Sequence, residues 1–315
     1  MNSMELLLVI MAAIVIDIFL GEPPSKIHPV VLMGLTIDYF KKKLIKFNNK
    51  LSGVFLSILT VLIFILITYI ILEISKINIF IYFIVSAIIL STTFSIRLLI
   101  TSILKVKTDL ETNIDQARLS VSYLVSRNTS DLSSQQLISA AVESLTENIT
   151  DSVISPLFYT FIFGIWGAVA YRVINTLDAM VGYKDLENKE IGWFSAKFDD
   201  ILNFIPARIT GVLIVISAFI LQKNWKQAYK IMIRDSSNTP SPNSGYSMAA
   251  AAGALDVKLT KRGTYSLGDG ENPLEIETIS EAVLLTEFTI ALFIIISSIL
   301  YAIFITFISK TIILI

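Results

Sequence analysis

Residues 51–72 read LSGVFLSILTVLIFILITYIIL, a run without a single charged side chain. A helix that spans a bilayer needs roughly 20 such residues, because its backbone hydrogen bonds must all be made within the segment. The stretches 77–96 and 288–309 are also uncharged and of similar length. These three runs therefore predict membrane-spanning helices.

Three further segments are weaker candidates for membrane insertion. Segment 6–20 is interrupted by Asp17, segment 205–222 contains Arg208, and segment 152–171 contains a proline and two glycines. Since no alternating strand pattern of consequence is present, the expected class is all-α. We predict a polytopic integral membrane protein with cytoplasmic helices and loops, about four to six membrane-embedded segments, and a single membrane-embedded domain over residues 1–315.

Composition narrows the possible chemistry. The chain has 315 residues, of which 54% are hydrophobic and 16% charged, whereas soluble domains are nearer a quarter charged. Lys plus Arg total 25 against 26 Asp plus Glu, so no excess of positive charge indicates a nucleic-acid partner. There is no Cys and only one His, His28, which excludes thiolate and multi-histidine metal sites. Any bound metal would have oxygen ligands, which suits Mg²⁺.

The distribution of Lys and Arg predicts the topology. Segments 21–50, 104–150 and 223–286 are rich in these residues and are expected on the cytoplasmic side of the plasma membrane. Segment 172–208 faces outward if both 152–171 and 205–222 span. It faces the cytoplasm if either segment is re-entrant or buried against other helices. The proline and glycines of 152–171 favour the second arrangement, with the active site on the cytoplasmic side.

An acidic ladder lies just before one of these apolar segments. Glu143, Glu147 and Asp151 are spaced at i, i+4 and i+8, which places them on one helix face where they repel one another. A solvated face of an amphipathic helix is the ordinary explanation for such a pattern. Next to an apolar run, however, the carboxylates require a positive partner. The ladder therefore points to a metal, a cationic substrate or paired Arg or Lys side chains.

Two downstream clusters repeat this oxygen-rich chemistry. Asn175 and Asp178 are three residues apart, and Asn203 follows Asp199 by four residues and Asp200 by three. Each cluster alone is also compatible with helix capping or a polar belt at the membrane surface. Together with the ladder, the clusters suit Mg²⁺ that carries phosphate groups.

Several other residues are candidates for binding phosphate or substrate. Arg127, Lys184 and Arg208 can contact phosphate, although topology alone would also explain their presence. The loop 241–245 can present Ser241 and Asn243 at the start of a following helix. His28 precedes a proline, where a structural hydrogen bond is the common alternative to substrate contact.

The order of these motifs resembles the adenosylcobinamide-phosphate synthases of cobalamin biosynthesis, the CobD/CbiB family. At residues 126–129 this chain has Ser-Arg-Asn-Thr where the family usually has Gly-Arg-Asp-Thr, and the part after Leu255 matches loosely. The matching segments are Asp17–Gly34, Ala141–Tyr159, Tyr171–Lys184, Ser195–Arg208 and Ser241–Leu255.

The resemblance implies an ATP- and Mg²⁺-dependent ligase. Such an enzyme joins adenosylcobyric acid to (R)-1-aminopropan-2-ol or its O-phosphate and yields adenosylcobinamide or its phosphate. The residues expected to be catalytic are Glu143, Glu147, Asp178 and Asp200. Those expected at the metal are Glu147, Asp151, Asp178, Asp199 and Asp200. Those expected to bind substrate or phosphate are His28, Arg127, Asn175, Lys184, Arg208, Ser241 and Asn243.

Two other classes of function remain as alternatives. Acids within a membrane protein and an interrupted helix also suit a transporter for a cationic or metal substrate. A non-catalytic membrane scaffold is the second alternative. The expected partners of the ligase are the corrinoid, the aminopropanol or its phosphate, and membrane lipid. A homo-oligomer or a complex with other enzymes of the pathway is also compatible with the sequence.

Overall fold

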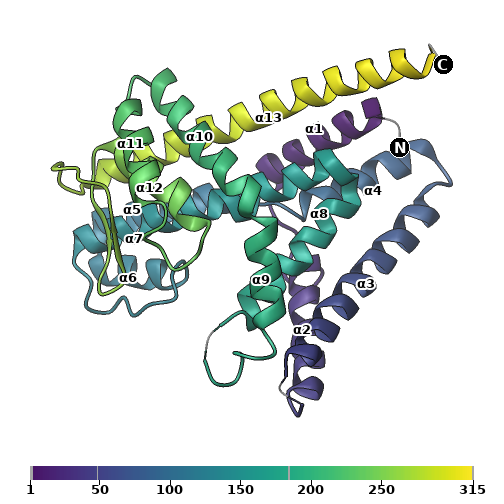
Figure 1. The fold of residues 1–315 in the computed structure, drawn as a ribbon, viewed down its shortest axis with the longest axis horizontal. Helices are drawn as coiled ribbons and strands as arrows, with labels where there is room; N and C mark the ends of the chain where they lie inside the picture. Colours follow the sequence, from purple (N-terminus) through teal and green to yellow (C-terminus); the bar gives the residue numbers. More distant parts are fainter. Residues whose placement is uncertain (1–2, 48, 184, 314–315) are drawn as a thin grey trace. The chain divides into compact units, whose positions relative to one another are not determined.

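The computed structural model describes residues 3–47, 49–183 and 185–313, with side chains from Met4 to Phe307 within these ranges (Figure 1). The predicted phosphate-binding residue Lys184 lies outside the described residues. The chain divides into two compact units. Unit 1 comprises Met1–Ile96, Ser155–Leu202 and Ile296–Ile315, and unit 2 comprises Arg97–Ile154 and Asn203–Ile295.

Unit 1 is built from helices, with α2 beside α3 and α8 packed against α2, α3, α4 and α9 (Figure 1). Helix α1 packs on α4. The helices of this unit are α1 (Ser3–Leu20), α2 (Pro29–Leu44), α3 (Lys50–Ser75), α4 (Ile79–Ser91), α8 (Ser155–Val181) and α9 (Trp193–Leu202).

Unit 2 contains a group of mutually packed helices, α10, α11 and α12, with α7 against α12. A short antiparallel hairpin, β1–β2, packs through β1 on α7 and pairs Lys261 with Tyr265. Helix α5 (Ile96–Thr112) begins at the last residue of unit 1, and α13 (Ile276–Ile313) begins in unit 2 and ends in unit 1. The other elements are α6 (Ile114–Ser122), α7 (Ser134–Ile149), the π-helix η1 (Thr150–Ile154), α10 (Phe204–Ile220), α11 (Trp225–Asp235), α12 (Ser244–Leu255), β1 (Leu259–Lys261) and β2 (Tyr265–Leu267).

The helices confirm the predicted class of an all-α polytopic membrane protein. Within the described residues, four helical stretches are long and apolar enough to cross a membrane, and a fifth is present if α9 and α10 form one bent span. The four stretches are Lys50–Ser75, Ile79–Thr112, Ser134–Val181 and Ile276–Phe307. Many apolar side chains of α3 face outward, including Leu62 and Leu66 at 58% exposure each. Such a surface is stable against lipid and unfavourable in water.

Local sequence signals explain where the helices begin. The Asn49 side chain accepts the Ser52 N–H at 2.8 Å, and the Ser52 hydroxyl accepts the Asn49 N–H at 3.3 Å, which is a reciprocal capping box at the start of α3. Ser133 and Gln136 form the same arrangement at α7. Ser133 therefore caps α7.

Two predicted membrane segments are interrupted. In segment 77–96, helix α4 ends at Ser91 and α5 begins at Ile96. The N–H of Ile96 donates to Asp17 Oδ2 at 2.9 Å, which fixes the start of α5. Helix α8 breaks at Gly164, which has φ +65° and ψ −155°. Only glycine adopts this backbone conformation at low cost. The break lies within the weaker predicted segment 152–171.

Helix α6 ends at Ser122, and hydrogen bonds tie the following loop to it. The Thr129 hydroxyl donates to the Arg118 carbonyl at 2.8 Å, and Arg118 Nε donates to the Leu132 carbonyl at 3.1 Å. These hydrogen bonds stabilise a loop where a further helical turn would otherwise form.

The turn between α1 and α2 is fixed by buried hydrogen bonds. His28 Nδ1 accepts the Val30 N–H at 3.1 Å, so a neutral ring carries its proton on Nε2. That nitrogen lies 2.8 Å from Glu22 Oε2, and the Ser95 hydroxyl donates to Glu22 Oε1 at 2.6 Å. The hydrogen bond with His28 outweighs the effect of burial and lowers the pKa of the Glu22 carboxyl below its usual value. The ionised Glu22 therefore ties the turn to the segment before α5.

A glycine controls the approach of α9 to the end of α8. A Cβ at Gly192 would lie 1.7 Å from the Val181 carbonyl oxygen, whereas one at Gly34 would lie 3.3 Å from the flexible Met180 sulfur. We expect Gly192→Ala to destabilise the protein by at least about 2–3 kcal/mol, because backbone must move. Gly34→Ala should change stability by less than about 1 kcal/mol. Thermal unfolding in detergent checks both, and equal midpoints for the two variants would contradict the predicted packing.

The Glu22 contact predicts a dependence of stability on pH. A carboxyl whose pKa is lowered in the folded state stabilises at pH values above its unfolded pKa of 4.5 and loses that contribution as pH falls through the lower folded value. Glu22→Gln should therefore cost about 1–2 kcal/mol at pH 7. The difference from the unaltered protein should shrink below pH 4.5.

A suitable control for this pH experiment is Glu187→Gln. The Glu187 side chain is 65% exposed and pairs with Lys41 at 3.0 Å. An exposed pair of this kind contributes less than about 1 kcal/mol. Thermal midpoints measured from pH 7 to pH 4 compare the three proteins. A Glu22→Gln difference that stays constant over this range would disprove the assignment to an ionised Glu22.

Candidate functional site

In unit 1 the packing of α8 against α9 gathers the predicted acids of both helices. Asn175 Nδ2 donates to Asp199 Oδ1 at 3.4 Å, and the negative charge of Asp200 acts on Asp178. The Tyr159 hydroxyl donates to the Leu202 carbonyl at 2.9 Å and fixes the end of α9 against α8. We call Asn175, Asp178, Asp199 and Asp200 the unit 1 acid patch. Its members were predicted from two separate motifs.

The acid patch continues toward the turn that contains His28. Arg172 Nη1 donates to Asn175 Oδ1 at 3.4 Å, and its positive charge also acts on Glu22. A polar path therefore runs from His28 and Glu22 through Arg172 to Asn175 and Asp199. His28 is 5% exposed and caps α2. This is the structural role considered for it, and its predicted contact with substrate stays a prediction.

In unit 2 the buried carboxylate of Glu143 is the centre of a hydrogen-bond network. It accepts from the Ser139 hydroxyl at 2.7 Å and from the Tyr265 hydroxyl at 2.8 Å. Arg127 Nη2 lies 3.3 Å from Glu143 Oε2. The Ser139 hydroxyl also accepts the Thr260 N–H of β1 at 2.9 Å. Glu143 thus connects α7, the loop before it and the β1–β2 hairpin.

Two features keep this hairpin fixed. Burial, together with the nearby Glu143 charge, raises the pKa of the Tyr265 phenol well above its usual value, so it remains a donor. At the other end, Asp235 Oδ2 accepts the Gly268 N–H at 2.8 Å. Burial would raise the pKa of Asp235, but hydrogen bonds from Arg234 and Gly268 lower it overall. Both anchors are therefore in their hydrogen-bonding form at neutral pH.

The second member of the acidic ladder lies beside a helix start and a cation. The Glu147 carboxylate is within hydrogen-bonding reach of Ser244, the first residue of α12, and it senses the charges of Lys261 and Glu143. The third member, Asp151, is in the π-helix η1, which packs on α10. A π-helical turn is uncommon and is often found at functional sites.

The predicted loop 241–245 and Arg208 meet at the same helix start. Arg208 Nη1 donates to Asn243 Oδ1 at 3.3 Å, and the guanidinium lies over the rings of Phe204 and Tyr246 at 3.4 and 4.3 Å from their centroids. The Ser241 hydroxyl accepts the Asn243 N–H at 3.2 Å. The loop is therefore a locally bonded turn with a stacked arginine beside it.

The candidate residues fall into two sets, one in each unit. Unit 1 holds His28, Asn175, Asp178, Asp199 and Asp200. Unit 2 holds Arg127, Glu143, Glu147, Asp151, Arg208, Ser241 and Asn243. In the described part of the chain, no group of three or more acidic or histidine side chains is arranged to hold a metal without other ligands. The predicted catalytic and metal-binding roles stay predictions.

The sequence did not single out four residues that complete these clusters: Glu22, Ser139, Lys261 and Tyr265. Ser139 precedes Glu143 by one helical turn, a spacing that can signal a hydrogen bond. Glu22 precedes His28 within one turn-forming segment. Tyr265 and Lys261 are far from Glu143 in the chain and belong to a very short hairpin, so no local pattern connects them.

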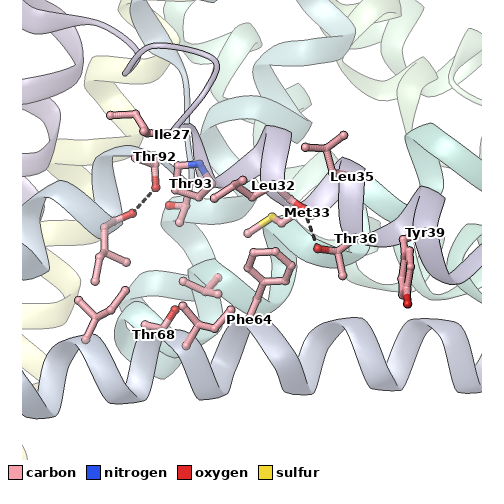
Figure 2. A pocket seen from close by; sticks show the side chains of 15 residues that line it. Ile27, Leu32, Met33, Leu35, Thr36, Tyr39, Phe64, Thr68, Thr92 and Thr93 are labelled. Atoms are coloured by element: carbon pink, nitrogen blue, oxygen red, sulfur yellow. Dashed lines mark hydrogen bonds between the residues drawn. The ribbon is translucent and has the colours of Figure 1, made fainter.

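A cavity of about 580 Å³ in unit 1 has a mostly apolar lining, unlike the two polar clusters described above. Figure 2 shows Leu32, Met33 and Phe64 pointing into it. Its hydroxyls are used locally, since Thr36 donates to the Leu32 carbonyl and Thr92 to the Ile89 carbonyl, each at 2.8 Å. None of the predicted site residues lines this cavity. Its lining suits hydrocarbon and not a charged substrate.

Comparison with known proteins matches the chain to one family along most of its length. Residues 10–305 match the family described as CobD/Cbib protein. A probable cobalamin biosynthesis protein CobD from Methanothermobacter thermautotrophicus is 49% identical over 286 residues, which cover 90% of this chain and 94% of that protein. The cobalamin biosynthesis protein CobD of Dehalococcoides mccartyi is 43% identical over 88% of this chain and 91% of its own length.

A more distant relative extends the same agreement. A probable cobalamin biosynthesis protein CobD from Methanocaldococcus jannaschii is 37% identical over 93% of this chain and 98% of its own length. No solved structure matches the chain. The extent of the family match and the near-complete coverage of the relatives confirm the resemblance found in the motifs. The chain therefore belongs to the CobD/CbiB protein family.

Proposed function

We propose that this protein is an enzyme of cobalamin biosynthesis that forms an amide in an ATP-dependent reaction. It joins adenosylcobyric acid to (R)-1-aminopropan-2-ol or its O-phosphate, and the product is adenosylcobinamide or its phosphate. Membership of the CobD/CbiB family and the names of the relatives support the pathway. The observation that carries the metal-dependent part of the proposal is the acid patch of unit 1, where Asp200 acts as a like charge on Asp178 and Asn175 contacts Asp199.

The proposed chemistry requires activation of a carboxylate. Phosphoryl transfer from ATP to the corrinoid carboxylate forms an acyl phosphate and ADP. The amine nitrogen then forms the carbon–nitrogen bond, the carbon–oxygen bond to phosphate breaks, and the nitrogen loses a proton. Binding, orientation and charge neutralisation supply most of the catalysis in such a reaction.

The residues present fit a bound Mg²⁺. This ion is usually held by one or two carboxylates together with substrate phosphates, so a complete set of protein ligands is not required. We propose that one or two of the acids Asp178, Asp199 and Asp200 hold it in unit 1 together with substrate phosphate, with Glu147 and Asp151 as the acids available in unit 2. When bound, the ion neutralises phosphate charge. The contacts of Glu143 with Ser139, Tyr265 and Arg127 support a positioning role for it.

The proposed location is the plasma membrane, with the site on the cytoplasmic side. The apolar helices fit a membrane protein, and the basic segments 21–50, 104–150 and 223–286 support the cytoplasmic orientation. ATP is available on that side. The proposed partners are the corrinoid, the amine or its phosphate, and the lipid around the apolar helices.

The acid patch yields a direct test of this function. Asp178→Asn should lower amide formation by at least about 100-fold, because it removes a charge that the proposed metal requires. Membrane insertion and the thermal midpoint should stay close to those of the unaltered protein. Product is measured by mass spectrometry with adenosylcobyric acid, ATP, Mg²⁺ and each amine.

Asp38→Asn is the matched control, since Asp38 is on α2 and forms an exposed ion pair with Lys42. Its activity should be unchanged. If Asp178→Asn forms product at the rate of the control, the role of Asp178 is wrong. If the unaltered protein forms no product with either amine, the proposed reaction is wrong.

A further inference from the structure

A cavity of about 360 Å³ lies in unit 2 between the loop that precedes α7 and the β1–β2 hairpin. We call it the hairpin pocket. Three cationic side chains line it, Arg127, Lys261 and Arg262, with a single acid, Asp131. The volume is within the range of small-molecule sites, roughly 300–1,000 Å³. The excess of positive charge on its wall selects an anion.

The cations have hydrogen-bonding capacity that the protein does not use. A guanidinium has five N–H donors, and among the described residues Arg127 donates only from Nη2, to the Glu143 carboxylate. Arg127 Nε is buried and has no partner within the described part of the chain. Within the described ranges, the side chains of Lys261 and Arg262 form no ion pair and no hydrogen bond. Donors therefore remain for a bound anion.

Acidic groups near the pocket do not cancel this charge at its wall. Glu143 does not line the pocket, and its oxygens already accept from Ser139, Tyr265 and Arg127. Glu147 senses the charge of Lys261 but is not among the lining residues. Glu143 consequently orients the guanidinium while the pocket itself stays cationic. An arginine held in this way loses little freedom when it binds a ligand.

The hairpin wall is also held in place before any ligand binds. The Thr260 N–H donates to Ser139 Oγ at 2.9 Å, and Tyr265 is bonded to Glu143. Strand pairing places Lys261 opposite Tyr265, next to the turn that begins at Arg262. Thr260, Thr264 and Gln136 add neutral polar groups to the lining. Cationic side chains on a fixed hairpin backbone, with neighbouring hydroxyl and amide groups, match the oxygens of a phosphate.

We propose that the hairpin pocket binds the phosphate group of a small phosphorylated substrate. Two kinds of molecule could supply this phosphate group, a nucleoside triphosphate and a phosphorylated amino alcohol. The choice of these two sources rests on the proposed function. The pocket brings Arg127, which the sequence predicted to bind phosphate, together with Lys261 and Arg262. From the sequence, Lys261 and Arg262 were only part of the basic segment 223–286 that is expected on the cytoplasmic side.

The test removes the two hairpin charges and measures binding without turnover. The double variant Lys261→Gln/Arg262→Gln is compared with Lys258→Gln, an exposed basic residue that precedes β1 and does not line the pocket. The probes are a non-hydrolysable ATP analogue, O-phosphorylated 1-aminopropan-2-ol and the unphosphorylated amine. Isothermal titration calorimetry of the full chain in detergent gives each affinity.

We expect the double variant to bind at least one phosphorylated probe at least about tenfold more weakly, which corresponds to about 1.4 kcal/mol. The Lys258→Gln variant should differ by less than about twofold. Binding of the affected probe should weaken as salt is raised. Arg262→Lys should retain most of the affinity because it keeps the charge. Thermal midpoints show whether each variant is folded.

The pattern of loss identifies the source of the phosphate. Weaker binding of the ATP analogue alone assigns the pocket to the nucleotide, and weaker binding of the phosphorylated amine alone assigns it to the amine. The proposal is overturned if the double variant binds both phosphorylated probes as well as the control does, or if the unaltered protein binds neither. A failure of amide synthesis would overturn the proposed function and leave this result intact.

Discussion

Carboxylates inside an apolar helical protein must be surrounded by hydrogen-bond donors, because an unpaired buried charge is strongly destabilising. This constraint connects segments that are far apart in the chain. Asp17 of α1 accepts the first N–H of α5, Glu143 of α7 accepts the Tyr265 hydroxyl, and Asp235 accepts the Gly268 N–H. In each case the acid is on a helix and the donor is on a loop, a hairpin or a helix start. The connecting segments are thus positioned by buried acids as well as by apolar packing.

The same principle separates two kinds of candidate acid. Glu143 is surrounded by donors from three different segments, so its charge is compensated within the protein. In the unit 1 acid patch Asp200 acts as a like charge on Asp178, and Asp200 itself forms an ion pair with Lys197 at 3.5 Å. A compensated acid can orient its neighbours but has little capacity left for a metal. A repelling pair is stabilised by an external cation. The contacts of Glu143 therefore favour a positioning role, while the metal-binding role of the acid patch stays a proposal that its like charges support.

Hydropathy and helix spacing predicted the class of the protein, since a membrane helix satisfies its own backbone and is recognisable within one segment. They did not predict the interruption before Ile96, because it depends on Asp17, a residue of another helix. Spacing also placed Asn175 and Asp178 on one face, while their meeting with Asp199 and Asp200 required the packing of α8 on α9. The sequence did not predict the hairpin, because strands of three residues are too short to show an alternation of apolar and polar side chains.

The charges of the two units bear on the choice between ligation and transport. Carboxylates repel phosphate and serve it only through a metal, whereas Arg and Lys bind it directly. Unit 1 has a patch of the first kind, and unit 2 has cations of the second kind in the hairpin pocket. A carrier for a cationic substrate has use for the acids alone, and a pocket with three cations would repel its cargo. Cationic side chains that neutralise phosphate charge are a recurrent part of phosphoryl-transfer sites. The hairpin pocket therefore supports phosphate chemistry over cation transport.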